Sequence, residues 1–287
     1  MSKRKLKIMT VSAHPHDWTW FSATLGIHVQ RGDQVTVCVV THGGSTHREK
    51  WLDEMRKPED ERDPAIINEP METYIEQKAS EMKGAAAIFG ITDVRMLNFS
   101  DKPFLIERYP EAIDRIMDLI LDIRPDVIIT ESPFTSGDTG LESPHRNDHT
   151  EVGIATMEAK ERASWPNTKS VVSPHTVAVT FWPGIVFDKS KVDFFIELSQ
   201  EMLEKRVQAE AFYTTQGHDL SWSRRRMEID IGHTGTEART EWAESFVREK
   251  PELLTHLPVP ELMVQQTEET SLERIARMSG KVKDDQT

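Results

Sequence analysis

Histidine and acidic residues gather at two points of the sequence where an apolar run gives way to a helix-like pattern. His14, His16 and Asp17 follow directly after the apolar run 6–12, and Asp148 and His149 open a later helical stretch. A divalent metal with three protein ligands and an open position takes imidazole and carboxylate donors from separate, rigid elements. His14, Asp17 and His149 could form such a set. From spacing alone, a metal site and a group of structural histidines both remain open.

The elements that must position these residues alternate in type along the chain. Apolar runs typical of strands are followed by segments with helical periodicity. The expected strands span 6–12, 34–41, 94–99, 126–131 and 176–182, and the expected helices span 18–31, 71–90, 111–123 and 149–163. This alternation predicts an α/β fold with a mostly parallel sheet and helices on both faces. Ligands of such sheets bind beyond the carboxyl ends of the strands, where the polar clusters fall.

Three segments do not follow this alternation of strands and helices. Residues 47–70 are highly charged and contain three prolines, which indicates a surface excursion or, alternatively, a lid or subunit contact. Residues 191–212 are expected to form one long amphipathic helix, and 223–287 a polar tail with few apolar residues, frayed over 277–287. We therefore predict a catalytic domain over 1–190, with 191–287 as an extension that packs on it.

The composition excludes several classes of function. The chain has 287 residues, 37% of them hydrophobic, and a formal net charge of −13, which disfavours nucleic acid and anionic membranes as partners. Cys38 is the only cysteine, so no intrachain disulfide can form and a reducing compartment suits the chain. No apolar stretch approaches the roughly 20 residues of a membrane span, and the basic N-terminus continues as a strand instead of a signal sequence. We expect a soluble, cytoplasmic protein.

The segment "SAHPHDWTWFSATLGIHVQRGDQVTVCVVTHG" resembles the amino-terminal signature of the zinc-dependent PIG-L/LmbE family of N-acetylglucosaminyl deacetylases, which opens with Ala-His-Pro-Asp-Asp-Glu. The family's second motif, His-Pro-Asp-His, is matched by residues 146–149, and "EMKGAAAIFGI" is similar to the family's alanine-rich helix. The likeness covers about residues 5–182. It implies a Rossmann-like sheet, one zinc ion bound by His14, Asp17 and His149, and metal-activated water that attacks an amide of a small polar substrate.

The chain also departs from the family pattern. His16 replaces the aspartate that serves as general base, and Trp18 replaces the following glutamate. His145 lies one residue before the position of the second motif's first histidine, which Arg146 occupies. A histidine can serve as a base near neutral pH, so His16, or else His145, is the expected base, and Asp148 is expected to orient an imidazole. The expected substrate contacts are Trp18, His42, Gly43, Lys78, Asp101 and Arg146.

Three functions stay open at this point. The leading one is a zinc amidohydrolase or deacetylase. The same departures occur in a branch of the superfamily that includes 4-oxalomesaconate hydratase, so the second is a zinc hydratase or lyase for an unsaturated carboxylic acid, and the third is a catalytically silent metal-binding protein. The expected partner is a small polar or carboxylate-bearing substrate. The run Arg224-Arg225-Arg226 is expected to be a solvated turn or, alternatively, to bind a substrate carboxylate or a neighbouring subunit. Large side chains outside the sheet pattern, together with the resemblance, predict a homo-trimer or hexamer: Trp51, Met55, Trp222, Trp242 and Phe246.

Overall fold

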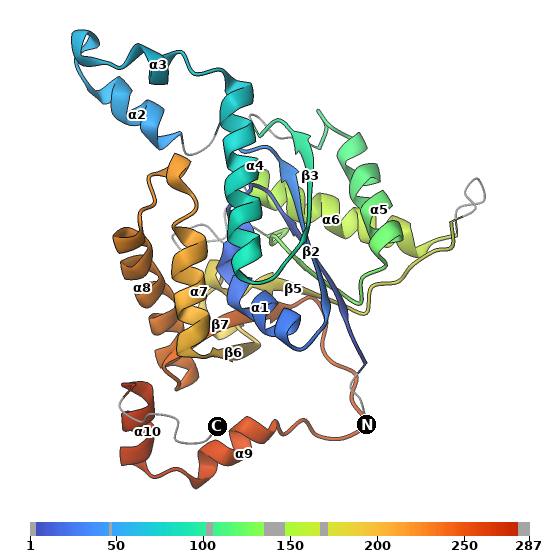
Figure 1. Ribbon diagram of the computed structural model, residues 1–287. Helices are drawn as coiled ribbons and strands as arrows, with labels where there is room; N and C mark the ends of the chain where they lie inside the picture. The colour runs from blue at the N-terminus through green and yellow to red at the C-terminus, as the bar shows by residue number, and fades with distance from the viewer. Residues whose placement is uncertain (1–3, 46–47, 102–105, 135–146, 167–171, 281–287) are drawn as a thin grey trace.

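A twisted, mostly parallel sheet forms the centre of the protein (Figure 1). The computed structural model describes residues 4–45, 48–101, 106–134, 147–166 and 172–280. Within them the strands are Lys7–Ser12 (β1), Gln34–Thr41 (β2), Asp93–Phe99 (β3), Val127–Thr130 (β4), Val179–Pro183 (β5), Phe194–Leu198 (β6) and Trp242–Arg248 (β7). Their order is β3-β2-β1-β4-β5-β7-β6. The first five are parallel, and β7 runs antiparallel to both of its neighbours.

The strand order reverses beside β1. The chain moves outward from β1 to β2 and β3, then returns to place β4 on the other side of β1, where Val11 pairs with Thr130. Such a reversal leaves a crevice beyond the carboxyl ends of the two central strands, where ligands of open α/β sheets bind. His14 follows β1 and Glu131 follows β4, so both lie at this crevice.

Helices cover both faces of the sheet (Figure 1). Ser22–Gln30 (α1), Met71–Ile88 (α4), Gln200–Glu210 (α7) and Leu220–Ala238 (α8) pack on one face, whereas Glu111–Ile123 (α5) and Asp148–Ser164 (α6) pack on the other. Alternation along β1 supplies both cores, since Ile8 belongs to the first and Met9 and Val11 to the second. A central strand that is apolar on both sides is the pattern expected of a covered parallel sheet.

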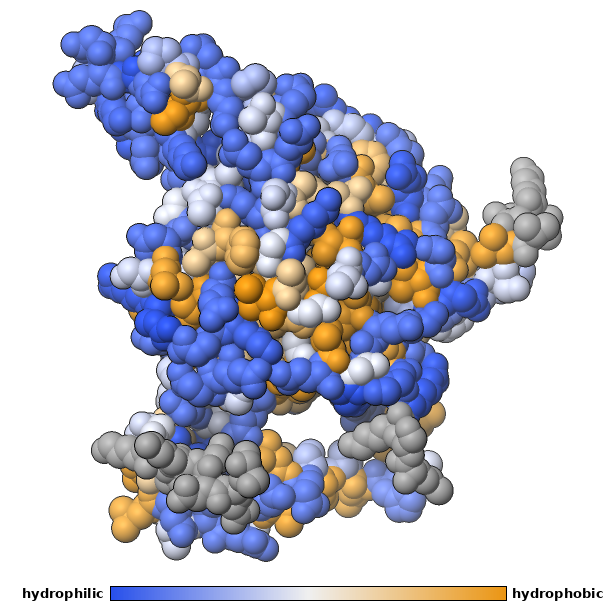
Figure 2. Space-filling model, viewed as in Figure 1, coloured by the Kyte–Doolittle hydropathy of each residue, from blue (hydrophilic) through white to orange (hydrophobic). Residues whose placement is uncertain are grey.

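The remaining elements lie at the periphery. Glu49–Arg56 (α2) and Pro64–Ile67 (α3) form a projection from the body, and short 3-10 turns span Asp17–Phe21 (η1), Glu59–Glu61 (η2), Gly184–Val186 (η3), Lys189–Lys191 (η4) and Thr214–Gln216 (η5). Residues 249–280, here called the C-terminal arm, carry Glu261–Glu268 (α9) and Ser271–Met278 (α10). Figure 2 shows apolar side chains on this arm, among which Leu253 and Leu257 are 100% and 91% exposed. None of the helices in the described ranges combines the length and the apolar content that crossing a bilayer requires.

The predicted α/β class and mostly parallel sheet are confirmed, but two secondary-structure predictions beyond residue 190 are wrong. Residues 191–212 do not form one helix: β6 comes first, and the side chain of Ser199 then caps α7 by accepting the backbone N–H of Met202. The expected polar tail contains α8 and β7, because the apolar face of β7 packs into the core. Phe246 is buried there and the partly buried Trp242 packs beside it, so both belong to the sheet instead of lying outside its pattern. Most of the predicted frayed end, from residue 281, lies outside the described residues.

Candidate metal centre and active-site cavity

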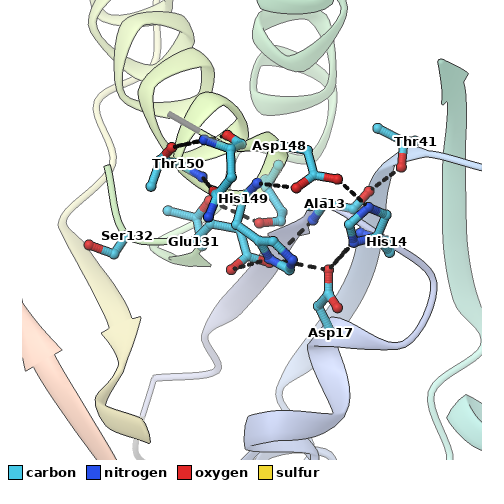
Figure 3. A network of polar contacts seen from close by, with 12 residues as sticks. Ala13, His14, Asp17, Thr41, Glu131, Ser132, Asp148, His149 and Thr150 are labelled. Atoms are coloured by element: carbon cyan, nitrogen blue, oxygen red, sulfur yellow. Dashed lines mark hydrogen bonds and ion pairs between the residues drawn. The ribbon is translucent and has the colours of Figure 1, made fainter. Parts of the chain in front are cut away.

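Three buried or half-buried side chains converge at the crevice between β1 and β4 (Figure 3). His14 and Asp17 come from the turn after β1, and His149 comes from the first turn of α6. The Asp17 carboxylate lies 3.1 Å from His14 Nδ1 and 3.6 Å from His149 Nδ1. The two imidazole rings stand edge to face, with centroids 4.9 Å apart. The structure thus brings together the three residues that the sequence predicted as metal ligands.

Neighbouring groups fix these side chains. The backbone N–H of His14 donates to Asp17 Oδ2 (2.7 Å), which closes the turn over the three residues. His14 Nε2 lies 2.7 Å from the Asp148 carboxylate, so its Nδ1 is left to face Asp17. Glu131 accepts the backbone N–H of Ala13 with one oxygen and places the other 3.4 Å from His149 Nδ1. A carboxylate that orients a metal-binding imidazole through its other nitrogen, as Asp148 does for His14, recurs in protein metal sites.

The start of α6 places Asp148 and His149 at the crevice. Asn147 caps the helix in a capping box, in which its side chain accepts the N–H of Thr150 and the Thr150 hydroxyl accepts the N–H of Asn147. One turn later, Gly153 lets the helix approach the end of β4 closely. A Cβ at this position would lie 2.7 Å from the carbonyl oxygen of Glu131. The cap and this close approach together set the position of His149 relative to β1 and β4.

The local charges favour a cation. Burial disfavours the imidazolium form of His14, but the facing Asp17 and Asp148 carboxylates outweigh burial and raise the pKa of His14 to about 10. Burial likewise opposes charge on His149, yet Asp17 and Glu131 raise its pKa to about 9. Burial favours the neutral form of Asp17, but the two imidazoles outweigh burial and hold the pKa of Asp17 well below its ordinary range. Carboxylates that draw protons onto two buried histidines would equally attract a metal ion.

The donor geometry suits a metal such as zinc. Zinc–nitrogen bonds of about 2.0–2.1 Å place the ligands of a tetrahedral ion about 3.3 Å apart. The separations of 3.1 Å and 3.6 Å around Asp17 lie on either side of that value. Two imidazoles and one carboxylate leave a position open for water or substrate, as in catalytic sites.

A cavity of about 500 Å³ opens beside this centre. Asp17 and His149 form part of its wall, and Trp20 stacks on the His149 ring with the ring centroids 5.7 Å apart. The opposite wall comes from the C-terminal half of the chain and includes Trp222 and Arg226. Glu49 and Asp53 of α2, His16, Gln216, Gly217 and His218 complete the lining. The charged excursion 47–70 therefore contributes to the cavity through α2.

His16, the predicted base, also lines this cavity but contacts a different set of residues. Its Nε2 lies 2.8 Å from Glu210 Oε1, and the same oxygen lies 3.2 Å from His218 Nδ1. His16, Glu210 and His218 thus form a second compact group of metal-type ligands. Their positions in the sequence do not connect them, since Glu210 ends α7 and His218 follows η5.

The predicted substrate contacts that the structure describes do not line this cavity. Trp18 is fully buried, and its indole N–H donates to the carbonyl of Pro15 and to the hydroxyl of Tyr213, so its predicted role in the pocket wall is wrong. Trp20 takes that place. Residues 17–21 form a 3-10 turn, in which side chains three apart eclipse, so Trp18 and Phe21 both face the core.

Lys78 is fully buried as well, and burial lowers its pKa to about 8. It does not line the cavity, and its contact with substrate stays a prediction. The loop after β2 is held by Asp101, whose carboxylate accepts the N–H of Ser45 and lies 3.4 Å from His42. Gly43 has a positive φ of 64° and packs against Pro15. His42, Gly43 and Asp101 thus support the turn that carries the metal ligands, and their contact with substrate stays a prediction.

Two further predicted residues, His145 and Arg146, lie outside the described residues. The residues that sequence reasoning missed are Glu131, Glu210, His218 and Trp20. Only Glu131 carried a usable signal, because an acidic residue at the end of a predicted central strand must lie at the same edge as His14. His218 and Tyr213 follow α7 in the sequence, and both are buried against the turn after β1.

Comparison with known proteins agrees with this geometry. The family model for GlcNAc-PI de-N-acetylases, PIG-L, matches residues 9–160. A curated relative, the probable N-acetyl-alpha-D-glucosaminyl L-malate deacetylase 2 of Bacillus cereus, is 33% identical over 109 residues, which are 38% of this chain and 44% of that protein. The match therefore spans less than half the length of this relative.

Solved structures with the same fold include both hydratases and deacetylases. GalB, the 4-carboxy-2-hydroxymuconate hydratase of Pseudomonas putida, superposes with a TM-score of 0.66 and 18% identity, covering 88% of this chain and 100% of its own. The N,N'-diacetylchitobiose deacetylase of Pyrococcus horikoshii gives a TM-score of 0.67 and 15% identity, covering 86% and 84%. The matched motifs, the fold and the convergence of their residues show that the chain belongs to the PIG-L family.

Proposed function

We propose that this protein is a zinc-dependent hydrolase that cleaves an N-acyl bond of a small polar substrate. The observation that carries the proposal is that the group of His14, Asp17 and His149 opens on a cavity of substrate size with His16 in its wall. A zinc ion held there would polarise the acyl carbonyl and lower the pKa of water towards neutrality. Family membership supports amide hydrolysis as the reaction.

The chain's own residues would divide the remaining tasks. Asp148 holds His14 with Nδ1 directed at the metal position. Glu131 lies beside Nδ1 of His149, the nitrogen that also faces Asp17, and would add negative charge next to the metal. His16 takes the place of the family's aspartate and would accept a proton from water and return it to the leaving amine, a role that imidazole fills well near neutral pH. Glu210 contacts Nε2 of His16 and would stabilise the imidazolium that forms.

The far wall of the cavity favours a substrate with a carboxylate. Arg226 lines this wall beside Trp222, with its guanidinium 5.1 Å from the indole centroid. Stacking on an indole holds a guanidinium in place, and its fork of N–H donors matches a carboxylate. A free, buried cysteine, Cys38, suits a reducing compartment, so we place the reaction in the cytoplasm.

Arg226 also supports a second candidate function. A hydratase that adds water to an unsaturated carboxylic acid would need the same metal, the same proton acceptor and a group that binds the carboxylate. GalB shows that the fold occurs in a hydratase. The two functions differ in the bond attacked, and one assay distinguishes them.

The test uses zinc-loaded protein incubated with a panel of N-acetylated amines and amino sugars and with a panel of unsaturated diacids. We expect release of acetate, measured by coupled assay, with loss of activity in His149→Gln and in His16→Ala, the second of which keeps its zinc. Loss of conjugated absorbance from the diacids without acetate release would favour the hydratase. Inactivity of zinc-loaded protein on both panels would instead support a silent metal-binding protein.

A further inference from the structure

We propose that His16, Glu210 and His218 form a second divalent metal site, distinct from the group of His14, Asp17 and His149. The two groups share no residue, although Asp17 follows His16 in the chain. Adjacent side chains of one turn thus serve different groups, and both groups line the same cavity. The donor set, two imidazoles and one carboxylate, is one that zinc and other transition metals bind.

The distances suit a shared ion. The ligand atoms all lie within 4.8 Å of one another, and Glu210 Oε1 is 2.8 Å from His16 Nε2 and 3.2 Å from His218 Nδ1. A tetrahedral zinc ion needs ligand atoms about 3.3 Å apart, so the three side chains require only small movements to close on one.

The three side chains are held in place before any ion binds. His218 stacks on Trp222 with ring centroids 3.9 Å apart, which fixes the plane of its imidazole. The preceding turn is anchored by Glu81, whose carboxylate accepts the hydroxyl and N–H of Thr215 and the hydroxyl of Thr214. Rigid supporting contacts of this kind lower the cost of binding a metal.

A second anchor ties this turn to the turn that carries His16. The Tyr213 hydroxyl donates to the carbonyl of Pro15 at 2.9 Å and accepts the indole N–H of Trp18. Tyr213 is fully buried, and its ring packs edge to face on His16, with centroids 4.6 Å apart. His16 and Glu210 are 194 residues apart in the sequence, yet the buried contacts of Tyr213 join the turns beside them.

Glu210 points to a cation more directly than the histidines do. It is only 1% exposed, and within the described residues its Oε2 accepts no hydrogen bond. A buried carboxylate oxygen without a partner is unfavourable, and nearly all such groups in proteins are satisfied. A metal ion bound by both oxygens of Glu210 would satisfy Oε2 and would replace the contacts that Oε1 makes to the two histidines.

A metal at this second site would change the chemistry of the cavity, an expectation that rests on the proposed function. His16 bound to a metal cannot accept a proton from water. The first equivalent of zinc would therefore activate the enzyme and the second would inhibit it. Metal counting tests the site itself without reference to any activity.

The experiment is equilibrium dialysis of metal-stripped, full-length protein against buffered zinc, with bound metal measured by mass spectrometry. We expect wild-type protein to saturate at two ions per chain. His218→Gln and Glu210→Gln should each bind one, and His149→Gln should also bind one. The control Glu204→Gln, on the exposed part of α7, should keep two, because Glu204 pairs only with surface groups such as Arg224.

The contrast among variants identifies the site. Circular dichroism spectra that match the wild type would show that the variants are folded, and saturation of wild type at one ion would overturn the proposal whatever the variants do. Two ions in both His218→Gln and Glu210→Gln would also overturn it, because the second ion would then lie elsewhere. Loss of both ions in His149→Gln would overturn it too, because the second ion would then not bind independently of the first group.

Discussion

Substitution of Asp148 is the sharpest test of which contacts orient the predicted metal ligands. Its carboxylate lies 2.7 Å from His14 Nε2, and its side chain is 20% exposed. If this contact keeps the proton on Nε2, it leaves Nδ1 free to bind the metal next to Asp17. Asp148→Asn preserves the size of the side chain and an acceptor oxygen but removes the charge, so it isolates the electrostatic part of the contact.

The size of the effect follows from the kind of hydrogen bond that is lost. A hydrogen bond to a charged partner contributes about 1.5–3 kcal/mol, and a neutral one about 0.5–1.5 kcal/mol. The substitution should therefore cost about 1.4 kcal/mol of metal binding, which corresponds to a roughly tenfold weaker zinc affinity. This agrees with the lower end of the 10–100-fold losses typical of residues that orient a metal ligand.

The assay is competition for zinc between the protein and a chromophoric chelator. Glu111→Gln is a matched control, because Glu111 is likewise an acidic first residue of a helix, α5, but its side chain is exposed. Any general effect of charge at a helix N-terminus would appear in both variants. Zinc affinity within twofold of wild type in Asp148→Asn would refute the view that Asp148 orients His14.

Three further outcomes are expected. Burial raises the pKa of Cys38 to about 12, so its thiol stays protonated at pH 8 and a thiol reagent should label native protein only as fast as it unfolds; rapid labelling would contradict this. Gly153→Ala should lower the free energy of unfolding by about 1–3 kcal/mol, because the new methyl group would contact the backbone at the end of β4, and it should weaken zinc binding, whereas Glu158→Ala on the exposed side of α6 should do neither. We also propose that the exposed apolar residues of the C-terminal arm mediate the predicted self-association, so light scattering should give a trimer or hexamer for wild type and a smaller species for Leu257→Glu, and a monomeric wild type would count against it.

The local sequence pattern was sufficient to predict those strands and helices that their own residues define. The strand over 34–41 and the helix over 111–123 match the predicted bounds, since each is defined by its own periodicity and flanking residues. β6 and β7 were missed because each strand is stabilised by the other: Phe194 pairs with Phe246, more than fifty residues away. The sequence around β6 fits a helix equally well, and only this distant pairing decides between the two.

The candidate site shows the same division. His14, Asp17 and His149 were predictable because each follows a strand end or opens a helix, and parallel strands bring such positions to one edge. Glu210 and His218 have no such signal, since their place beside His16 depends on how α7 packs against the turn after β1. The exchange of Trp18 for Trp20 has a local cause, namely a 3-10 turn where a regular helix was expected.

Residues from two parts of the chain line the cavity. The metal group lies within residues 9–160, which match the family model, whereas Gln216, His218, Trp222 and Arg226 come from beyond it. A substrate bound at the metal would contact this second wall with its remaining atoms. Changes in α7, η5 and α8 could therefore alter the preferred substrate while the metal ligands stay in place. Under the proposed function, residues 9–160 would supply the metal ligands, and the C-terminal helices packed against them would set the selectivity for substrate.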